Sequence, residues 1–235
     1  MSTKTLDRLI NSQIHRWEKE KKARERRDES LQRRSPIITI SRQVGSGGGE
    51  IGALTAKKLK YPFLDRAIVE SIAERASIRQ TAVETLDERA RGMMEEYLRA
   101  VMKMDDLSRS EYLRQLTEVL VVAAQHGRVV ILGRGAGFLL RSFPLLRVRI
   151  VCPPKIRAER IALKNSMTMR EAEEMVEVID KERALFIRNN FFMDISDATN
   201  YDLIINSEMI SASHASDAIV RMFRMLYLQD RDKER

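Results

Sequence analysis

The stretch from Pro36 to Gly52 constrains the fold of this chain more than any other. It reads Pro-Ile-Ile-Thr-Ile-Ser-Arg-Gln-Val-Gly-Ser-Gly-Gly-Gly-Glu-Ile-Gly. The β-branched run at 37–40 predicts a short buried strand, and the apolar spacing after Glu50 predicts a helix. The glycines between them predict a tight turn that brings backbone N–H groups and a helix N-terminus to a phosphate. A flexible loop is the alternative, but a linker needs neither the strand nor the helix.

The P-loop pattern Gly-x4-Gly-Lys-Ser/Thr fits this stretch only in part. With its second glycine placed on Gly47, Arg42 stands at the first glycine. Gly48 then replaces the phosphate-binding lysine, and Gly49 replaces the hydroxyl residue that binds magnesium. The turn therefore keeps the backbone of a phosphate loop and lacks its cation.

Residues 47–52 also spell Gly-x-Gly-x-x-Gly, the dinucleotide fingerprint. Asp65 lies downstream, near the place of a ribose-binding acid. This interpretation is weaker, because six residues separate Ile40 from Gly47 and the fingerprint normally follows its strand at once.

The composition predicts one soluble α/β domain with an appendage. A chain of 235 residues can bury one sizeable core, and its hydrophobic fraction of 43% and charged fraction of 32% are those of a charge-rich soluble protein. Cys152 is the single cysteine, which excludes an intrachain disulfide and suits a reducing compartment. The longest apolar run, 119–124, is too short to span a bilayer, and no signal peptide is apparent. We therefore expect a cytoplasmic protein without a membrane segment.

Much of the net charge of +8 lies at the N-terminus. Residues 1–34 carry eleven Lys/Arg against six Asp/Glu, a net charge of +5, and read as a long charged helix. Its first half has an apolar face made of Leu6, Leu9, Ile10, Ile14 and Trp17. A basic arm for nucleic acid and a helix for a protein partner or self-association are two interpretations. Acidic residues are mixed throughout residues 1–34, and Trp17 is the only Phe, Tyr or Trp in this segment. We therefore favour a helix packed on its own domain and expect no nucleic-acid binding.

The remainder of the chain alternates strands and helices. Four further strands are predicted at 61–65, 128–132, 147–151 and 201–206. Residues 66–126 read as helices with breaks, one of them at a capping box formed by Ser77 and Gln80. Later helices begin at Pro153-Pro154 and at a second capping box, Thr168-x-x-Glu171, and a closing helix spans 212–228.

Two charged residues stand at the carboxyl ends of predicted strands, where parallel sheets gather ligands. Asp65 ends the strand 61–65, with a surface-loop aspartate as the alternative. Arg134 follows the strand 128–132 within Gly-Arg-Gly-Ala-Gly, a second glycine cluster that we expect to face the first. Its planar fork of donors suits a phosphate or carboxylate, and a surface arginine in a tight turn is the alternative.

Arg183 lies on the apolar stripe of the helix that begins after Thr168, four residues past Ile179. A guanidinium on an inward face needs a partner, either a buried carboxylate or a ligand phosphate. Both partners stay open at this point. Arg188 lies on another face of the helix and is a weaker candidate.

Five motifs occur in order along the chain: Ile-Thr-Ile-Ser-Arg-Gln-x-Gly-Ser-Gly-Gly (38–48), Pro-Phe-Leu-Asp-Arg (62–66), Gly-Arg-Gly-Ala (133–136), Ile-Asp-Lys-Glu-Arg (179–183) and Asn-Tyr-Asp-Leu-Ile-Ile-Asn (200–206). Together they resemble the cytidylate kinase-like family, a branch of the P-loop nucleoside monophosphate kinases. The resemblance implies a three-layer α/β/α fold with a five-stranded parallel sheet. The domain would span 36–228, with a helical substrate-binding insertion at about 66–105 and a lid at about 155–190. A basic arm, 1–35, and a charged tail, 229–235, would flank it.

The resemblance also implies a reaction and a site. The reaction is transfer of the γ-phosphoryl group of ATP to CMP or a related monophosphate, with Mg²⁺. The implied ATP-phosphate residues are Arg42, Gly45, Ser46, Gly47, Gly48, Gly49 and Glu50. The implied monophosphate-binding residues are Asp65, Arg134 and Arg188, and the implied catalytic residues are Arg157, Arg160 and Arg183. No residue is expected to be a metal ligand.

The chain departs from the family pattern at two places. Family members commonly lack the P-loop lysine but have a basic residue at or beside position 49, where this chain has glycine. Gly135 replaces the aspartate of the Gly-Arg-Asp motif of true cytidylate kinases. We expect the loop 45–50 to hold the β-phosphate, and the three catalytic arginines, with Arg42, to replace the missing charge. A nucleotide-binding regulatory protein without turnover is the alternative.

Overall fold

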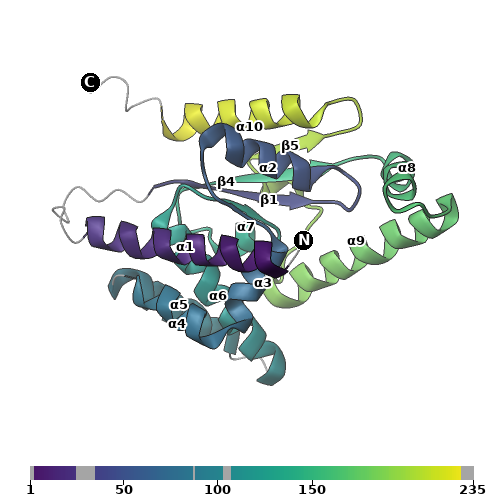
Figure 1. Ribbon diagram of the computed structural model, residues 1–235. Helices are drawn as coiled ribbons and strands as arrows, with labels where there is room; N and C mark the ends of the chain where they lie inside the picture. The colour runs from purple at the N-terminus through teal and green to yellow at the C-terminus, as the bar shows by residue number, and fades with distance from the viewer. Residues whose placement is uncertain (1–2, 25–34, 87, 103–106, 229–235) are drawn as a thin grey trace. The chain divides into compact units, whose positions relative to one another are not determined.

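The computed structural model describes residues 3–24, 35–86, 88–102 and 107–228. They divide into two compact units, both drawn in Figure 1. The first unit comprises Met1–Ile37, Leu64–Val129 and Leu140–Pro144, and the second comprises Ile38–Phe63, Val130–Leu139 and Leu145–Arg235. The predicted arm beyond residue 24 and the predicted tail 229–235 lie outside the described residues.

The second unit is built on a five-stranded sheet of order β2-β3-β1-β4-β5. Its strands are β1 (Ile37–Arg42), β2 (Phe63–Leu64), β3 (Val130–Leu132), β4 (Leu145–Val151) and β5 (Leu203–Asn206). β1 pairs parallel with β3, and β4 pairs parallel with β5. The predicted five-stranded parallel sheet is confirmed, although β2 is shorter than predicted. Because β3 lies between β2 and β1, the order differs from the 3-2-1-4-5-6 order of dinucleotide-binding domains.

One face of the sheet carries the main core of the second unit. Helices α2 (Gly48–Leu59) and α10 (Ala212–Tyr227) cover it. Ile38 and Ile40 of β1 pack there with Ile51 of α2 and with Ile219 and Phe223 of α10. Strand side chains alternate between faces, so the neighbouring Thr39 and Ser41 point to the opposite face. Burying one such side chain contributes about 1.5–3 kcal/mol, so this face fixes the register of β1.

The remaining helices of the second unit follow β3 and β4. They are α7 (Ala136–Leu139), α8 (Pro154–Asn165), α9 (Met169–Phe191) and the short 3-10 helix η2 (Ala198–Asn200). α8 and α9 pack as a hairpin through Ala158, Ile161, Ala172 and Val176. Thr168 caps α9, and its box with Glu171 is present in both directions, as the sequence predicted. Pro154 occupies the first turn of α8, where a proline is tolerated.

The first unit is helical. Its helices are α1 (Thr3–Arg24), α3 (Arg66–Glu74), α4 (Ala76–Glu84), α5 (Glu88–Met102) and α6 (Leu107–His126). The helices after β2 therefore continue to residue 126, past the predicted insertion 66–105. The predicted capping box at Ser77 is wrong, because α4 already begins at Ala76. The ion pair between Arg79 and the buried Glu118 links α4 to α6.

The apolar face predicted on the N-terminal helix is buried within the first unit. α1 packs on α3 and α4. Ile10 is fully buried and Trp17 is 2% exposed, whereas Leu9 lies partly in solvent. The Trp17 ring stacks on His126 of α6, with the ring centroids 5.8 Å apart. Among the described residues, no helix combines the length and apolar character needed to cross a membrane.

A polar contact centred on Glu20 joins α1 to α6. Glu20 Oε1 accepts a hydrogen bond from Arg16 Nε at 2.8 Å, and Oε2 lies 3.2 Å from His126 Nδ1. Burial alone would raise the pKa of the Glu20 carboxyl, but the hydrogen bonds from His126 and Arg16 outweigh it and lower this pKa. A lowered carboxyl pKa adds stability above the unfolded-state pKa of about 4.3, and that stability is lost as the pH falls through the folded-state pKa.

Replacing Glu20 by glutamine should therefore have a pH-dependent effect. At pH 7 we expect the free energy of unfolding to fall by about 1 kcal/mol, a figure reduced for the partial exposure of the carboxylate. The difference from the wild type should shrink below about pH 4, where the wild-type carboxyl also loses its charge. Urea unfolding at a series of pH values measures this, with the exposed Glu18→Gln as control. A difference that stays constant with pH would contradict the assignment.

Candidate functional site

The glycine loop joins β1 to α2 at the carboxyl edge of the sheet. Gly45 and Gly47 both have φ of +74°, in the left-handed region that favours glycine. A Cβ on Gly45 would lie 2.7 Å from the carbonyl oxygen of Arg157, so the start of α8 packs directly on the loop. Gly47 is the N-cap of α2. The predicted strand, turn and helix are all present.

The N-terminus of α2 presents backbone donors. The first backbone bond of the helix runs from Ile51 N–H to the Gly47 carbonyl at 3.0 Å. The N–H groups of Gly48, Gly49 and Glu50 therefore precede the helical pattern and have no acceptor inside the helix. Together with the positive end of the helix dipole they suit an anion. Gly49 and Glu50 are exposed, so the terminus is open to solvent.

Two side chains from distant elements fasten the loop. Asp180 of α9 accepts a hydrogen bond from Val44 N–H at 3.0 Å. Ser207, which follows β5, donates its hydroxyl to the carbonyl of Ser46 at 2.7 Å. The buried Ser46 also donates its own hydroxyl to the Gln43 carbonyl at 2.8 Å. These bonds hold the loop in one conformation before any ligand arrives, which is the condition for electrostatic preorganisation.

Arg42 runs between two glycines. A Cβ on Gly48 would lie 2.5 Å from the Cβ and 3.1 Å from the Cγ of Arg42, so the stem of Arg42 occupies the space of a side chain at position 48. A Cβ on Gly133, at the end of β3, would overlap the guanidinium of Arg42. The missing lysine and the unusual arginine are therefore one reciprocal change. The arginine stem passes Gly48, which leaves room for it, and the guanidinium lies beside Gly133 at the end of β3.

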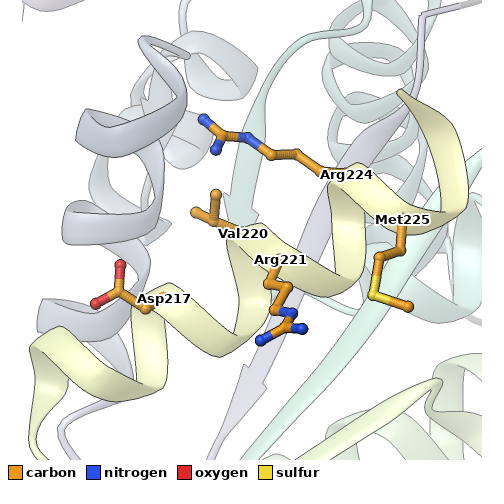
Figure 2. Close-up of a pocket in the computed structure, with 5 residues that line it drawn as sticks. All are labelled: Asp217, Val220, Arg221, Arg224 and Met225. Carbon is orange, nitrogen blue, oxygen red and sulfur yellow. The ribbon is translucent and has the colours of Figure 1, made fainter. Parts of the chain in front are cut away.

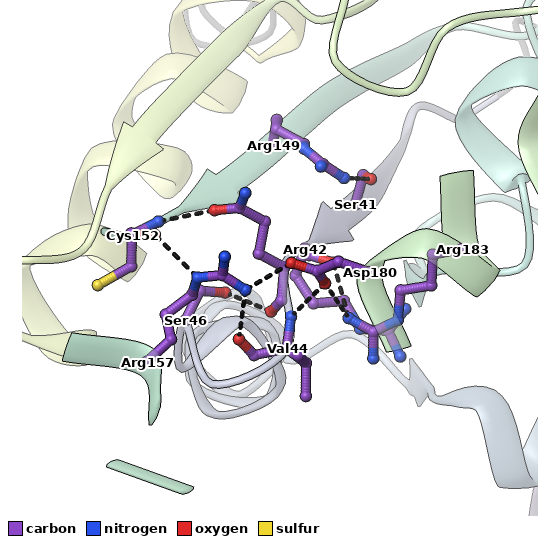
Figure 3. Close-up of polar contacts among 10 residues, drawn as sticks. Ser41, Arg42, Val44, Ser46, Arg149, Cys152, Arg157, Asp180 and Arg183 are labelled. Carbon is purple, nitrogen blue, oxygen red and sulfur yellow. Dashed lines mark hydrogen bonds and ion pairs between the residues drawn. The ribbon is translucent and has the colours of Figure 1, made fainter. Parts of the chain in front are cut away.

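Arg157 lies behind the loop with its side chain 5% exposed. It donates to the Cys152 carbonyl at 2.9 Å, to the Val44 carbonyl at 3.1 Å and to Asp180 at 2.5 Å (Figure 3). A guanidinium with these partners would have to release them to reach a phosphate. The structure thus gives Arg157 a positioning role, and its predicted catalytic role stays a prediction.

Arg160 is held in a similar way one turn later in α8. Its Nη2 donates to the carbonyl of Ser207 at 2.8 Å, and its Nη1 lies 3.4 Å from the Ser207 hydroxyl. Since Ser207 also bonds to Ser46, Arg160 supports the loop through the residue that follows β5. Its predicted contact with the γ-phosphate likewise stays a prediction.

Arg183 lies on the open side of the same cluster. Its Nη1 donates to the backbone carbonyl of Arg42 at 2.9 Å and lies 3.8 Å from Asp180. Figure 3 shows Asp180 between the guanidinium groups of Arg157 and Arg183. The carboxylate that the sequence left open as a partner for Arg183 is thus present, and 28% of the Arg183 side chain remains exposed. Arg188 is exposed on another face of α9.

The turn after β3 is left-handed over three residues. Gly133, Arg134 and Gly135 have φ of +80°, +53° and +68°. A non-glycine residue in this region costs about 1 kcal/mol, and such strain persists where the surrounding structure imposes it. The Arg134 guanidinium lies over the Phe186 ring at 6.0 Å. Arg134 therefore approaches α9 from the carboxyl end of β3.

Gly135 fits this turn because of Phe191. A Cβ at position 135 would overlap the Phe191 ring, and its φ is unfavourable for side chains. Gly135→Asp, which restores the Gly-Arg-Asp motif, should lower the free energy of unfolding by about 2–4 kcal/mol. In the double variant with Phe191→Ala, the loss of unfolding free energy should be smaller than the sum of the losses in the two single variants. Chemical denaturation would measure this difference. Strict additivity of the two changes would contradict the proposed overlap.

Asp65 belongs to the first unit and caps α3. Its Oδ1 accepts a hydrogen bond from Ile68 N–H at 3.0 Å. An N-cap aspartate contributes about 1 kcal/mol to a helix, which is a structural use for this residue. Its predicted contact with a monophosphate stays a prediction.

Three residues of the loop region escaped the sequence analysis. Asp180 falls within the motif 179–183 but stands among many acids on α9, and Ser207 lies in a short connection after β5, so neither was marked as a site residue. Arg149 of β4 is buried and donates to the hydroxyl of Ser41 at 2.6 Å. Only the general rule that a buried charge needs a partner would have marked Arg149, and burial was not visible in the sequence.

Two hollows lie elsewhere in the second unit. One is formed by α8 and α9, and is lined by Pro154, Lys155, Arg157, Glu173, Val176, Glu177 and Asp180. The other lies along α10, and is lined by Asp217, Val220, Arg221, Arg224 and Met225 (Figure 2). Two residues that line the first hollow, Arg157 and Asp180, also form hydrogen bonds to Val44 at the glycine loop. The second hollow is lined by none of the predicted site residues.

The residues around the glycine loop offer few ligands for a metal ion. Within the ranges that the structure describes, no three His, Cys, Asp or Glu side chains are grouped so that they could hold an ion. Gly49 supplies no hydroxyl, and the one acid in the first turn of α2 is the exposed Glu50. Mg²⁺ commonly binds through substrate phosphates and water with few protein ligands. The residues present therefore fit magnesium that arrives with a nucleotide, and they do not form a dedicated metal site.

Comparison with known proteins relates this geometry to a family. The model of the cytidylate kinase-like family matches residues 37–209. A cytidylate kinase from Pyrococcus horikoshii is 27% identical over 172 residues, which cover 73% of this chain and 79% of that protein. A cytidylate kinase from Saccharolobus islandicus is 26% identical over 181 residues, which cover 76% of this chain and 85% of that protein.

A solved structure supports the fold. The crystal structure of an uncharacterized protein from Eubacterium ventriosum matches with a TM-score of 0.63 at 19% sequence identity. The match covers 81% of this chain and 99% of that chain. At this level of identity the likeness concerns the fold alone.

Proposed function

The chain belongs to the cytidylate kinase-like family, and from this premise we propose that it transfers the γ-phosphoryl group of ATP to a nucleoside monophosphate. CMP is the first acceptor to consider, because it is the substrate in the names of the similar proteins from Pyrococcus and Saccharolobus. The observation that carries the proposal is the preorganised loop between β1 and α2, with its open backbone donors and the stem of Arg42 beside Gly48.

The loop is proposed to bind the β-phosphate of ATP. Gly48, Gly49 and Glu50 would direct their N–H groups at the phosphate oxygens, aided by the dipole of α2. Magnesium would arrive bound to the nucleotide and neutralise part of the charge on the phosphates. The bonds from Asp180 and Ser207 keep the loop fixed, so that little reorganisation is needed during the reaction.

Arg42 and Arg183 are proposed to supply the positive charge that stabilises the migrating phosphoryl group. Arg42 passes beside Gly48, where the lysine of a standard loop begins, and Arg183 is bonded to the Arg42 carbonyl. Phosphoryl transfer depends mainly on positioning and on charge around the transferred group. The acceptor is already a phosphate oxygen, so no general base is required.

The hairpin of α8 and α9 is proposed to be the lid. It contributes Arg157, Arg160 and Arg183, and all three are bonded to backbone carbonyls around the loop. In this account Arg157 and Arg160 position the loop, and they reach the γ-phosphate only if the hairpin moves. Arg134 and Arg188 are proposed for the monophosphate.

A coupled assay of ADP release tests the function. Purified chain, ATP and magnesium are combined in turn with CMP, dCMP, UMP, AMP and GMP. We expect release of ADP that depends on the monophosphate and is largest with a cytidine or related pyrimidine acceptor. Equal slow release with every monophosphate and with none would identify an ATPase and contradict the proposal.

A nucleotide-binding protein without turnover is the second candidate. It is favoured by the bonds of Arg157 and Arg160, which are engaged with the protein. It predicts that ATP raises the melting temperature while no monophosphate supports ADP release. The same assay, run beside a thermal-shift measurement, separates the two candidates.

A further inference from the structure

Arg149 is a buried cation whose assigned contacts are with neutral groups. It lies on β4 and is 7% exposed. Its Nη1 donates to the Ser41 hydroxyl at 2.6 Å, and its guanidinium lies 5.7 Å from the centre of the Tyr201 ring. Within the described ranges, no carboxylate forms an ion pair with it. A buried charge without a counter-charge is costly, which indicates that an anion completes the site.

The neighbouring Arg147 is paired with a carboxylate of the protein. It lies two residues earlier on β4, on the same side of the strand, and pairs with Asp202 through two bonds of 2.6 and 3.1 Å. Burial lowers the pKa of Arg149, against the opposing effects of Tyr201 and Asp180. For Arg147 the largest effect is the hydrogen bond to Asp202, and the pKa of Arg147 is raised. Of these two arginines on one strand, Arg147 pairs with a protein carboxylate, and Arg149 has no such pair within the described residues.

The position of Arg149 indicates which anion it serves. Ser41 directly precedes Arg42 at the carboxyl end of β1, and Figure 3 shows the Arg149 guanidinium at that end. Ser41 points to the face of the sheet opposite α2, because Ile40 points to the face that α2 covers. The donor phosphates are proposed for the N-terminus of α2. An anion beside Ser41 would therefore lie on the other face of the sheet from the donor phosphates, where an acceptor could approach them.

An aromatic cluster links this place to Arg134. Tyr201 meets Phe138 edge to face at 6.2 Å, and Phe138 stacks with Phe191 at 5.9 Å. Phe191 meets Phe186, over which Arg134 lies. The two guanidinium groups therefore flank one cluster of rings on the same side of the sheet.

We propose that Arg149, held by Ser41 and Tyr201, binds the phosphate of the acceptor monophosphate. The inference rests on the proposed function, and it adds an acceptor-phosphate residue to those already considered. A guanidinium fixed by a hydroxyl and a ring is preorganised for two parallel bonds to phosphate oxygens.

Three variants test this proposal. Arg149→Met keeps the apolar stem and removes the charge, Arg149→Lys keeps the charge and removes the fork, and Arg147→Met is the control on the same strand. Each is measured by thermal unfolding without ligand, with CMP and with ATP, and by KM for both nucleotides.

The expected results separate an acceptor site from a structural role. Without ligand, Arg149→Met should melt within about 2 °C of the wild type or above it, because it removes an uncompensated buried charge. Its KM for CMP should rise roughly 10- to 100-fold, and its KM for ATP should change less than about twofold. Arg149→Lys should recover part of the loss. Arg147→Met should lower the melting temperature and leave both KM values within about twofold of the wild type.

Each opposite result has a defined meaning. If Arg149→Met fails to fold, or melts lower with an unchanged KM for CMP, Arg149 is structural and the proposal is wrong. If the wild type shows no turnover but CMP raises its melting temperature only when Arg149 is present, the binding site stands and the kinase proposal fails. If CMP stabilises the wild type and Arg149→Met equally, the site fails.

Discussion

Replacing Arg183 by alanine should lower kcat/KM for phosphoryl transfer on the order of 10³-fold, as loss of a charge-stabilising arginine does in related chemistry. The Arg183 side chain is more exposed than that of Arg157, and it reaches the loop through the Arg42 carbonyl. Its removal takes a cation from the place where charge develops and leaves Asp180 with Arg157 as its remaining ionic partner.

Two further variants make the Arg183 result specific. Arg170→Ala removes an exposed arginine from the first turn of α9, which pairs only with Glu174 within the described contacts, and should leave kcat/KM within about twofold. Arg183→Lys should retain an intermediate rate, because it keeps the charge without the fork. Steady-state rates at saturating CMP measure all three. A rate for Arg183→Ala within tenfold of the wild type would show that the lid arginine is not part of the reaction.

Restoring the lysine of the standard P-loop at position 48 should damage the protein. A Cβ there would lie 2.5 Å from the Cβ of Arg42 and 3.5 Å from that of Ile150, and atoms so close to the backbone cannot swing away. We expect Gly48→Lys to lower the free energy of unfolding by about 3 kcal/mol and to abolish measurable turnover. Denaturant unfolding and the ADP-release assay measure the two effects.

The double variant Arg42→Gly, Gly48→Lys tests whether the Arg42 stem is what excludes the lysine. It removes the obstructing stem and recreates the standard order of glycine and lysine, so it should recover most of the stability and some of the activity. Gly49→Ala is the control, because its Cβ would come no closer than 3.9 Å to Leu132, and it should be close to neutral. If Gly48→Lys alone were as stable as the wild type and faster, Arg42 would not occupy the lysine's place.

The parts of the fold that follow from local pattern were predictable. The β-branched run before the glycines is β1, and the box at Thr168 caps α9, because both signals act within a few residues. The box at Ser77 failed because packing of α4 on α6, a long-range effect, set the start of that helix. The same distinction separates the predictable and unpredictable parts of the site.

The site depends on contacts between residues far apart in the chain. Arg157 was predicted to face a phosphate, but it is bonded to the carbonyl of Val44, which lies 113 residues away. The alternation along β4 places Arg147 and Arg149 on one side without saying which of them another element covers. The sequence identified Arg157, Arg160 and Arg183 but not Arg149, and only the tertiary structure could divide the arginines into positioning residues and candidates for phosphate binding.

The sequence shows unusual residues at positions 42 and 48, but it does not show that the two are related. The sequence displayed a missing lysine and an arginine in place of a glycine as two separate defects of one motif. The structure places the arginine stem in the space of the missing side chain, so the two changes depend on each other. Steric exclusion at 2.5 Å is a property of the folded turn and has no counterpart in residue spacing.

We propose that a phosphate loop without lysine transfers a phosphoryl group by using Arg42. Formation of CDP from CMP and γ-labelled ATP, separated by anion exchange, tests it most directly when the wild type and Arg42→Met are compared side by side. We predict label in CDP with the wild type, and a rate at least about 10²-fold lower with a folded Arg42→Met. Binding of ATP by the wild type without label in any nucleoside diphosphate, or an equal rate for the two proteins, would contradict the claim.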